Sequence, residues 1–487
     1  MHRRLFLKSA IATTAAISLP AKLYSRVIGA NGKLRVAVVG LRGRGNDHLQ
    51  GLGEHVVAVC DCDKSILDST APDRSFDKYS DFRQLLQRAE IDAVSIATPN
   101  HTHAIIAIES INAGKDVYVE KPVSHNVWEG RQIVSAARKH NAIVQCGTQS
   151  RSSPSLQEAV KFVRSGELGR VQYAVGTCYK PRMSIGKLSQ PMAIPESIDF
   201  DLWCGPAEKR EIYRPNLHYD WHWDFNTGCG DMGNQGIHQM DIARWFLGET
   251  QLSRRVLSVG GRLGYDDAGD TPNAQCVFHE FENSFLVFET RGLPKAKSFH
   301  EPSLWPKNMD SFRGSTVGVV VQLEGGHVLI PNYSSAVAFD THGKEVKRWD
   351  GEGNHYDNFI QAVQANDRSL LSAEVEQGHL SSAVCHTGNI SHRLGRKATL
   401  GEIQKSIGDN PVFADSVKRM ALHLSDNGID LESVPTLALG VDLKMDSVNE
   451  TFLASDDANR NLTREYRKPF EIKIAAREAK PEGLQSR

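Results

Sequence analysis

The sequence predicts an α/β protein in which a doubly wound, parallel-sheet domain precedes an α+β domain with an open, mostly antiparallel sheet. Three observations carry this prediction. Strand-length apolar runs alternate with helical segments between residues 33 and 150. A glycine-rich loop follows the first of these runs. Farther along, apolar or alternating runs at 274–281, 284–289, 317–323 and 328–330 follow one another, which is typical of an antiparallel sheet.

The first domain is expected to span residues 33–150, with strands that are buried on both faces. Residues 34–39 are apolar without alternation, as expected of a strand between two helical layers. Further strands are expected at 55–60, 91–97, 116–119 and 142–146, with helices at 101–113 and 127–140. Strands that alternate with helices form a parallel sheet, which binds its ligand at the carboxyl ends of the strands.

The loop after the first strand has the chemistry of a phosphate cradle. It contains Gly40, Gly43 and Gly45, and a helical stretch follows it. Glycine tolerates the positive φ of a sharp strand-to-helix turn. It also lets a pyrophosphate approach the backbone amides at the helix N-terminus. The spacing departs from G-x-G-x-x-G, because Arg42 occupies the place of the second glycine. A plain turn is the alternative interpretation.

An acidic residue at the end of the second strand completes the cofactor prediction. Asp61 lies 21 residues after Gly40, where an acid that binds the ribose hydroxyls of NAD is expected. A carboxylate there repels a 2′-phosphate, so we expect NAD. Arg42 and Arg44 keep NADP possible, because arginine can bind that phosphate.

Two later loops are expected to face the same cofactor. One loop follows the strand at 91–97 and the other follows the strand at 116–119. Their cofactor-facing residues are predicted to be Thr98, Pro99, Asn100, His103, Glu120 and Lys121. A lysine at the carboxyl end of a strand can be desolvated, which lowers its pKa. Lys121 could then orient or help to deprotonate an alcohol.

The sequences of these two loops resemble those of a known protein family. Residues 97–103, followed by Val119-Glu120-Lys121-Pro122, are similar to the glucose–fructose oxidoreductase, inositol dehydrogenase and rhizopine-catabolism family, Gfo/Idh/MocA. The resemblance extends from about residue 33 to about residue 400. It implies a Rossmann domain, a second domain with an open sheet that uses one face for subunit contacts, and a homo-oligomer (dimer or tetramer). It also implies that Lys121 lies near the nicotinamide and the reacting hydroxyl.

The segment 228–241 supplies the candidate proton acceptor. Asn234, His238 and Asp241 are spaced four and three apart, so a helix would place them on one face. The family usually has Asp-x-x-x-His-x-x-Asp here, which implies that His238 is the acid/base. Asn234 replaces the usual aspartate and cannot stabilise an imidazolium by charge, which leaves Asp231 and Asp241 as the candidates for that role. The alternative is a structural histidine.

An aromatic segment precedes it and is the predicted substrate contact. Tyr219, Trp221, His222 and Trp223 lie within residues 218–225. Aromatic rings stack on the apolar faces of sugars, and polar side chains bind the hydroxyls. An aromatic anchor for the sheet is the competing interpretation. His218 and His222 are four apart, but no HExxH arrangement is present, so no metal site is predicted.

The N-terminus predicts export. Residues 1–30 contain five Lys or Arg and no acid, so the formal charge of -1 leaves -6 on residues 31–487. Arg3 and Arg4 precede a short apolar run, as in a twin-arginine signal peptide. His2 and the lack of a clean Ala-x-Ala cleavage site depart from that pattern. A disordered basic terminus is the alternative to a periplasmic or secreted protein.

The remaining features set limits on the class of protein. A nearly neutral chain argues against a nucleic-acid partner, and no run of about 20 apolar residues predicts a membrane span. The eight cysteines contain no Cys-x-x-Cys pair and are expected to be mostly buried thiols. Residues 151–400 are assigned to the substrate domain and 401–487 to a C-terminal extension.

Together these features predict an exported NAD(P)-dependent oxidoreductase that acts on a hydroxyl of a sugar, glycoside or polyol. Because no free NAD pool exists outside the cytoplasm, the cofactor should stay tightly bound. Two other classes remain open at this point. One is a glycosidase or lyase that uses NAD for transient oxidation, and the other is a non-catalytic sugar-binding protein, which Asn234 favours.

Overall fold

The N-terminal domain contains a six-stranded parallel sheet in the order β3-β2-β1-β4-β5-β6. The computed structural model describes residues 33–72 and 74–472. The strands are β1 (Val36–Val39), β2 (Val56–Cys60), β3 (Asp77–Tyr79), β4 (Ala93–Ile96), β5 (Asp116–Val119) and β6 (Val144–Cys146). The strand order reverses between β1 and β4, which is the place where such sheets bind ligands. The prediction of a Rossmann domain is confirmed.

Five helices connect the strands of this sheet. They are α2 (Arg44–Leu52), α3 (Lys64–Ser69), α4 (Phe82–Leu85), α5 (Asn100–Asn112) and α6 (Val127–His140). Helix α6 shows how local sequence sets the bounds. Asn126 caps its first turn by accepting a hydrogen bond from the Glu129 amide, and Asn141 ends it in the left-handed conformation. The two predicted helices at 101–113 and 127–140 match α5 and α6 to within one residue at each end.

The second domain contains a 12-stranded sheet in which only β7 and β10 pair in parallel. Its main path is β14-β13-β12-β11-β7-β10-β9-β8-β16-β15. The predicted runs correspond to β9 (Ala274–Glu280), β10 (Phe285–Arg291), β11 (Val317–Leu323) and β12 (Gly326–Ile330). The other strands are β7 (Val171–Tyr179), β8 (Arg255–Gly261), β13 (Ser335–Asp340), β14 (Glu345–Asp350), β15 (Arg396–Ala398), β16 (Leu437–Leu439), β17 (Leu443–Asp446) and β18 (Thr451–Phe452). The open, mostly antiparallel sheet is confirmed.

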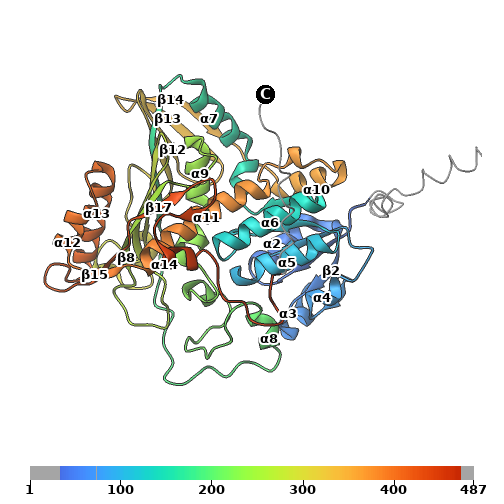
Figure 1. Cartoon of the computed structure of the whole chain (residues 1–487). Helices are drawn as coiled ribbons and strands as arrows, with labels where there is room; N and C mark the ends of the chain where they lie inside the picture. Colours follow the sequence, from blue (N-terminus) through green and yellow to red (C-terminus); the bar gives the residue numbers. More distant parts are fainter. Residues whose placement is uncertain (1–32, 73, 473–487) are drawn as a thin grey trace, which may run out of the picture.

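A layer of helices lies between the two sheets. It contains α7 (Pro154–Ser165), α9 (Ile237–Leu247) and α11 (Val375–Arg393), and Figure 1 shows it between the blue domain and the large sheet. Buried side chains of these helices and of the sheet form one apolar cluster. Helix α11 also packs on α6 of the first domain. Helix α10 (His355–Ala365) packs on the first domain through Phe359.

The opposite face of the large sheet is covered by helices from the C-terminal extension. Helices α12 (Leu400–Ser406) and α13 (Pro411–Asp426) lie outside the sheet (Figure 1). Phe413 and Met420 of α13 are buried against Cys276 and Phe278 of β9. The chain therefore covers part of this sheet face itself. The expected dimer or tetramer stays a prediction.

Residues 401–472 take part in both domains. β16 extends the large sheet, whereas the residues after α14 (Asp456–Arg460) return to the first domain. Figure 1 shows this dark red segment running from α14 toward α8 and α3. The expected signal peptide lies outside the described residues.

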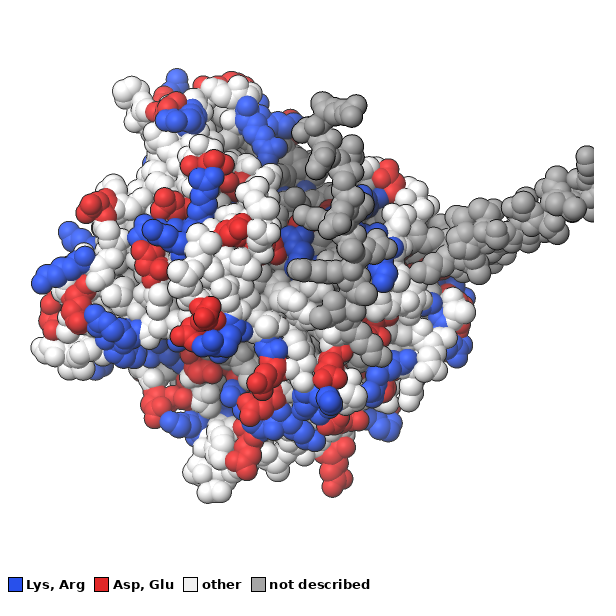
Figure 2. Space-filling view, in the orientation of Figure 1, with Lys and Arg blue, Asp and Glu red and all other residues white. Residues whose placement is uncertain are grey.

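The surface charges and the cysteines do not point to a particular function. Basic and acidic side chains are interspersed on the face seen in Figure 2. All eight cysteines are free thiols, and only Cys62 is more than slightly exposed. Among residues 33–72 and 74–472, no helix combines the length and the apolar character needed to cross a membrane.

Candidate active site

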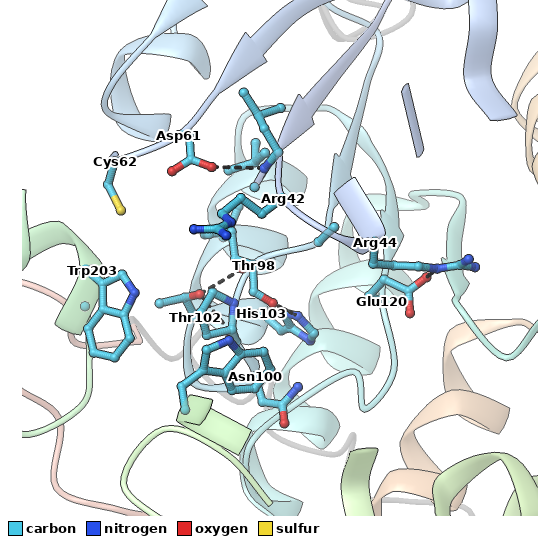
Figure 3. A pocket seen from close by; sticks show the side chains of 18 of the residues that line it. Arg42, Arg44, Asp61, Cys62, Thr98, Asn100, Thr102, His103, Glu120 and Trp203 are labelled. Carbon is cyan, nitrogen blue, oxygen red and sulfur yellow. Dashed lines mark hydrogen bonds and ion pairs between the residues drawn. The ribbon is translucent and has the colours of Figure 1, made fainter. Parts of the chain in front are cut away.

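A cavity of about 460 Å³ lies at the carboxyl ends of β1, β2, β4 and β5 (Figure 3). Its walls come from the glycine-rich loop, from the two predicted loops after β4 and β5, and from the aromatic segment of the second domain. Residues of helix α8 (Phe200–Cys204) and the distant Phe470 also line it. The site therefore lies between the two domains, where the strand order of the first sheet reverses.

The glycine-rich loop is as tight as its composition predicts. Gly40 has a φ of 85°, and a Cβ there would lie 2.8 Å from the Ala97 carbonyl. A Cβ on Gly45 would lie 1.9 Å from the Gly40 carbonyl oxygen. Gly43, with a φ of 47°, faces open space. The backbone thus turns sharply into α2 and leaves room in front of its first amides, which suits a pyrophosphate. Arg42 replaces the second glycine and lines the cavity.

Asp61 is held in place at the end of β2. Its carboxylate accepts hydrogen bonds from the amides of Leu41 and Asp63, at 3.0 and 2.9 Å. Burial raises the pKa of Asp61, and the two amides oppose that shift. The carboxylate lines the cavity beside the loop, where it can accept hydrogen bonds from ribose hydroxyls.

The two arginines of the loop differ in their partners. Arg44 donates to Glu120 at 2.8 Å (Figure 3) and also donates to Asp47 at 3.0 Å. It is therefore already neutralised by carboxylates. Arg42 has no ion pair with the residues that the structure describes, and its side chain is exposed. Only Arg42 is free to contact a second anionic group of a cofactor.

The loop after β4 contacts the loop after β5 through His103. The ring of His103 lies 2.7 Å from the Thr98 carbonyl oxygen and 2.7 Å from that of Pro122. Burial lowers the pKa of His103. Pro99 and Asn100 also line the cavity, and the buried Oδ1 of Asn100 has no hydrogen-bond partner. An unpaired acceptor in the wall indicates that a ligand donor completes this site.

Glu120 positions its neighbours. Its buried carboxylate contacts Arg44 and His48, at 2.8 and 3.1 Å, and accepts from the Lys121 amide at 3.1 Å. Burial alone would raise the pKa of Glu120, but Arg44 and His48 hold it well below its usual range. This carboxylate therefore stays charged and orients the loop that carries Lys121.

Lys121 projects into the cavity at the end of β5. Its Nζ donates to the main-chain oxygen of Asn234 at 2.6 Å. Burial lowers the pKa of Lys121, although Glu120 opposes this shift. The amine lies between the cofactor-facing loops and the second domain.

The approach to His238 differs from the regular helix that the spacing predicted. Residues Met232–Gly236 form a π-helical turn ahead of α9. Asn234 lies in this turn and lines the cavity, whereas His238 lies behind the wall with an exposure of 5%. Burial, followed by the Lys121 charge, holds the pKa of His238 well below its usual range. Its ring packs against Tyr333, and its Nδ1 has no partner.

The structure does not bring Asp231 or Asp241 to the cavity. Asp231 is paired with Arg182 at 2.6 Å, and Asp241 is paired with Arg151 at 2.9 Å. Both carboxylates are 1% exposed and bind their arginines through two oxygens. Each is committed to a buried ion pair between distant segments. The expectation that one of them might replace an aspartate at position 234 is therefore corrected.

The aromatic segment faces the cavity in part. Tyr219, Trp221 and His222 line it, and the rings of Trp221 and His222 stack with centroids 3.6 Å apart. Trp223 points elsewhere, since it is buried against the Arg182 guanidinium at 4.9 Å. His218 contacts Asp63 at 3.1 Å. The described residues contain no cluster of three or more metal-ligating side chains.

Several wall residues were not predicted as site residues, among them Leu202, Trp203 and Phe470. Phe470 had no local signal, because it reaches the cavity from the far end of the chain.

These features define a Rossmann-type dinucleotide-binding protein. Residues 34–148 match the family model described as oxidoreductase family, NAD-binding Rossmann fold. Residues 155–276 match the C-terminal alpha/beta domain of the same family. The chain belongs to the Gfo/Idh/MocA oxidoreductase family, as the sequence motifs indicated.

Curated relatives in this family include sugar and inositol dehydrogenases. Levoglucosan dehydrogenase of Pseudarthrobacter phenanthrenivorans is 28% identical over 180 residues, which cover 37% of this chain and 39% of that protein. Inositol 2-dehydrogenase of Salmonella typhimurium is 29% identical, over 34% of this chain and 51% of that protein. The matched segments thus span about half the length of these relatives or less.

Solved structures share the fold. The WlbA dehydrogenase from Bordetella pertussis, in complex with NADH and UDP-GlcNAcA, gives a TM-score of 0.54 at 17% identity. Levoglucosan dehydrogenase with NADH and levoglucosan gives 0.54 at 18% identity. Each alignment covers 73% of this chain and 97% of the other chain. At this identity the similarity concerns the fold alone.

Proposed function

We propose that this protein is an exported NAD(P)-dependent oxidoreductase that acts on a hydroxyl of a sugar, glycoside or polyol and keeps its cofactor tightly bound. The observation that carries the activity is the position of the Lys121 amine, in the cavity between the cofactor-facing loops and the aromatic segment. Relatives named for levoglucosan and inositol support a carbohydrate or polyol as the substrate.

The cavity walls fit a dinucleotide. Gly40 and Gly45 leave no room for side chains where the loop turns, and Asn100 presents an unpaired buried acceptor. Asp61 favours NAD over NADP, since a 2′-phosphate would meet its fixed carboxylate. Arg44 favours NAD as well, because it already pairs with Glu120 and is not free to bind a 2′-phosphate. When bound, the nicotinamide supplies the hydride chemistry that protein side chains lack.

The side chains around Lys121 assist proton transfer. The Lys121 amine orients the reacting oxygen, and burial reduces the cost of its neutral form. Burial also keeps the His238 imidazole neutral, and the neutral form is the one that can accept a proton. Trp221 and Tyr219 offer apolar faces to the C–H surfaces of a sugar ring.

Export is supported by the paired arginines and the acid-free composition of residues 1–30. An exported enzyme has no NAD pool to draw on, so retention of the cofactor follows from that location. We also propose a homo-oligomer. Its subunit contacts would use a surface other than the part of the β8–β10 face that α13 covers.

The test is a screen of sugars, glycosides and polyols with the purified full-length protein and added NAD. Bound dinucleotide is followed by mass spectrometry, and products are followed by chromatography. We expect reduced nicotinamide to form with one class of substrate. Lys121→Ala should lower kcat/KM by about 10²- to 10⁴-fold, because it removes a group that assists proton transfer. Lys64→Ala, at an exposed lysine of the same domain, is the matched control.

The outcomes separate the competing functions. Release of a sugar without net reduction of NAD would replace the dehydrogenase with the glycosidase or lyase. Sugar binding without turnover would indicate a non-catalytic protein. Full activity of Lys121→Ala would show that Lys121 does not take part in the reaction.

A further inference from the structure

The last described residues reach the wall of the cofactor cavity through Phe470. We name residues 463–472 the C-terminal strap. The strap begins after α14, passes α6 and α8, and ends beside α4 of the first domain. In Figure 1 it is the dark red segment that reaches the lower right of the molecule. It is the part of the extension that contacts the cavity, because Phe470 belongs to the cavity wall.

Specific polar contacts fix the first half of the strap. Arg464 donates to the main-chain and side-chain oxygens of Asn226, at 3.0 and 2.8 Å. Tyr466 donates to the buried Glu129 of α6 at 3.1 Å, and its ring packs against Trp128. These contacts join the strap to both domains.

Arg467 fastens the strap to α8. Its guanidinium donates to the side-chain and main-chain oxygens of Asp201, each at 2.6 Å, and to the Gly205 oxygen at 3.1 Å. Helix α8 supplies Leu202 and Trp203 to the cavity wall. The other end of α8 is held by the Asp199 amide, which donates to the Cys62 oxygen at 2.9 Å. Arg467 therefore holds this wall together with His101 of α5, whose Nε2 lies 2.8 Å from the Trp203 carbonyl oxygen.

Phe470 lines the cavity on the side of Asp61, because it packs against Phe82, which follows β3, and the Asp61 amide donates to the Tyr79 carbonyl of β3 at 3.2 Å. Its side chain is 2% exposed and packs in the apolar cluster of the first domain, with Phe82 and Leu202. The Arg83 and Arg467 guanidinium groups lie 5.4 and 4.9 Å from its ring centroid. Because Asp61 marks the ribose site, this aromatic ring lies at the adenosine end of the cavity.

We propose that the C-terminal strap retains the dinucleotide: Phe470 closes the adenosine end of the cavity, Arg467 holds α8 over it, and the cofactor leaves only when the strap lifts. This inference rests on the proposed function, because it needs a dinucleotide in the cavity. The strap would explain how a protein that works away from an NAD pool keeps its dinucleotide bound.

The experiment measures the dissociation rate of NADH from the full-length protein, by its loss of fluorescence after a chase with excess NAD. Phe470→Ala and Arg467→Gln should each increase this rate by about tenfold or more, since each removes contacts that close the cavity. Phe413→Ala and Arg460→Gln are the matched controls. Phe413 is about as buried as Phe470 but belongs to α13, away from the cavity, and Arg460 is an exposed arginine of α14.

Hydrogen–deuterium exchange of the unaltered protein provides a second measurement that does not depend on how a variant folds. The amides of residues 463–472 should exchange more slowly in the protein with bound dinucleotide than in the same protein after its dinucleotide has been removed. Dissociation rates that match the unaltered protein, or strap exchange that NAD does not change, would overturn the strap proposal alone. Failure of the unaltered protein to bind NADH at all would overturn both this inference and the proposed function.

Discussion

Lys121 differs from an ordinary surface lysine in its surroundings, and these surroundings favour the neutral form of its amine. Its amine is half-buried at the end of β5, close to the Asn234 main-chain oxygen, with Glu120 held charged behind it. Burial disfavours the ammonium form and lowers its pKa. The neighbouring His238 is shifted in the same direction, so neither group needs to start the reaction as a cation.

At the residue scale, the pH dependence of activity tests the role of His238. Desolvation disfavours its imidazolium, so the neutral form should persist well below the ordinary pKa of about 6.5. We expect kcat/KM to stay constant as the pH falls through that value, and to decline only at more acidic pH. A decline centred at or above about pH 6.5, absent from His238→Asn, would contradict this account.

The preference for NAD over NADP is predicted to depend on Asp61. Asp61→Ala removes the acceptor of the ribose hydroxyls and the carboxylate that repels a 2′-phosphate. The affinity for NAD should fall by about tenfold, as expected for one lost charge-assisted hydrogen bond. The affinity for NADP should fall less or improve. Calorimetric titration with both cofactors measures the ratio, and an unchanged ratio would argue against this placement of the ribose.

At the scale of elements, two buried ion pairs hold α9 and the turn before it against distant segments. Asp231 pairs with Arg182 after β7, and Asp241 pairs with Arg151 after β6. Ser381 of α11 also donates to Asp241. These carboxylates fix the position of the π-helical turn that presents Asn234 to the cavity. They act through position and not as proton acceptors.

Asp231→Asn tests this structural role. Breaking one side of a buried pair leaves the Arg182 charge uncompensated, which costs about 3–5 kcal/mol. Urea denaturation should show that loss, while the folded fraction keeps NAD binding and most of its kcat. A variant with native stability and no turnover would indicate that Asp231 acts as a proton acceptor.

At the scale of the whole molecule, buried neutral histidines set the response to acid. Burial lowers the pKa of His101 to about 4, and it is 0% exposed between the Trp203 and Thr227 carbonyls. Five more histidines are shifted to about 3 or 4 by burial: His222, His279, His355, His386 and His392. His101 lies in the first domain and the other five lie in the second.

The free energy of unfolding should therefore decrease as the pH falls. Below the unfolded pKa of about 6.5, the unfolded chain binds protons that the folded chain excludes, so stability is lost from there down to about pH 4. His101 alone should contribute about 3 kcal/mol over that window. His101→Gln should flatten the dependence, as measured by urea unfolding between about pH 7 and about pH 5. Equal slopes for the two proteins would refute the assignment.

The sequence predicted those parts of the molecule that depend on neighbouring residues. Buried parallel strands are continuous apolar runs, so β1, β2, β4, β5 and β6 were identified. The cofactor loops were identified because their residues are adjacent in the chain. β14 was missed, since Glu345–Asp350 is largely charged and exposed. Contacts between distant segments were also missed: the arginine partners of Asp231 and Asp241, and the arrival of Phe470 at the cavity.

The central claim is that the cavity between β1, β4 and α8 binds a dinucleotide that a sugar or polyol reduces. The most direct measurement is the absorbance and mass spectrum of the cofactor that the purified protein holds, before and after addition of substrate. The account predicts about one dinucleotide per chain, converted to its reduced form by a sugar or polyol and retained by the protein. A folded protein that carries no dinucleotide and binds none when it is added would contradict it.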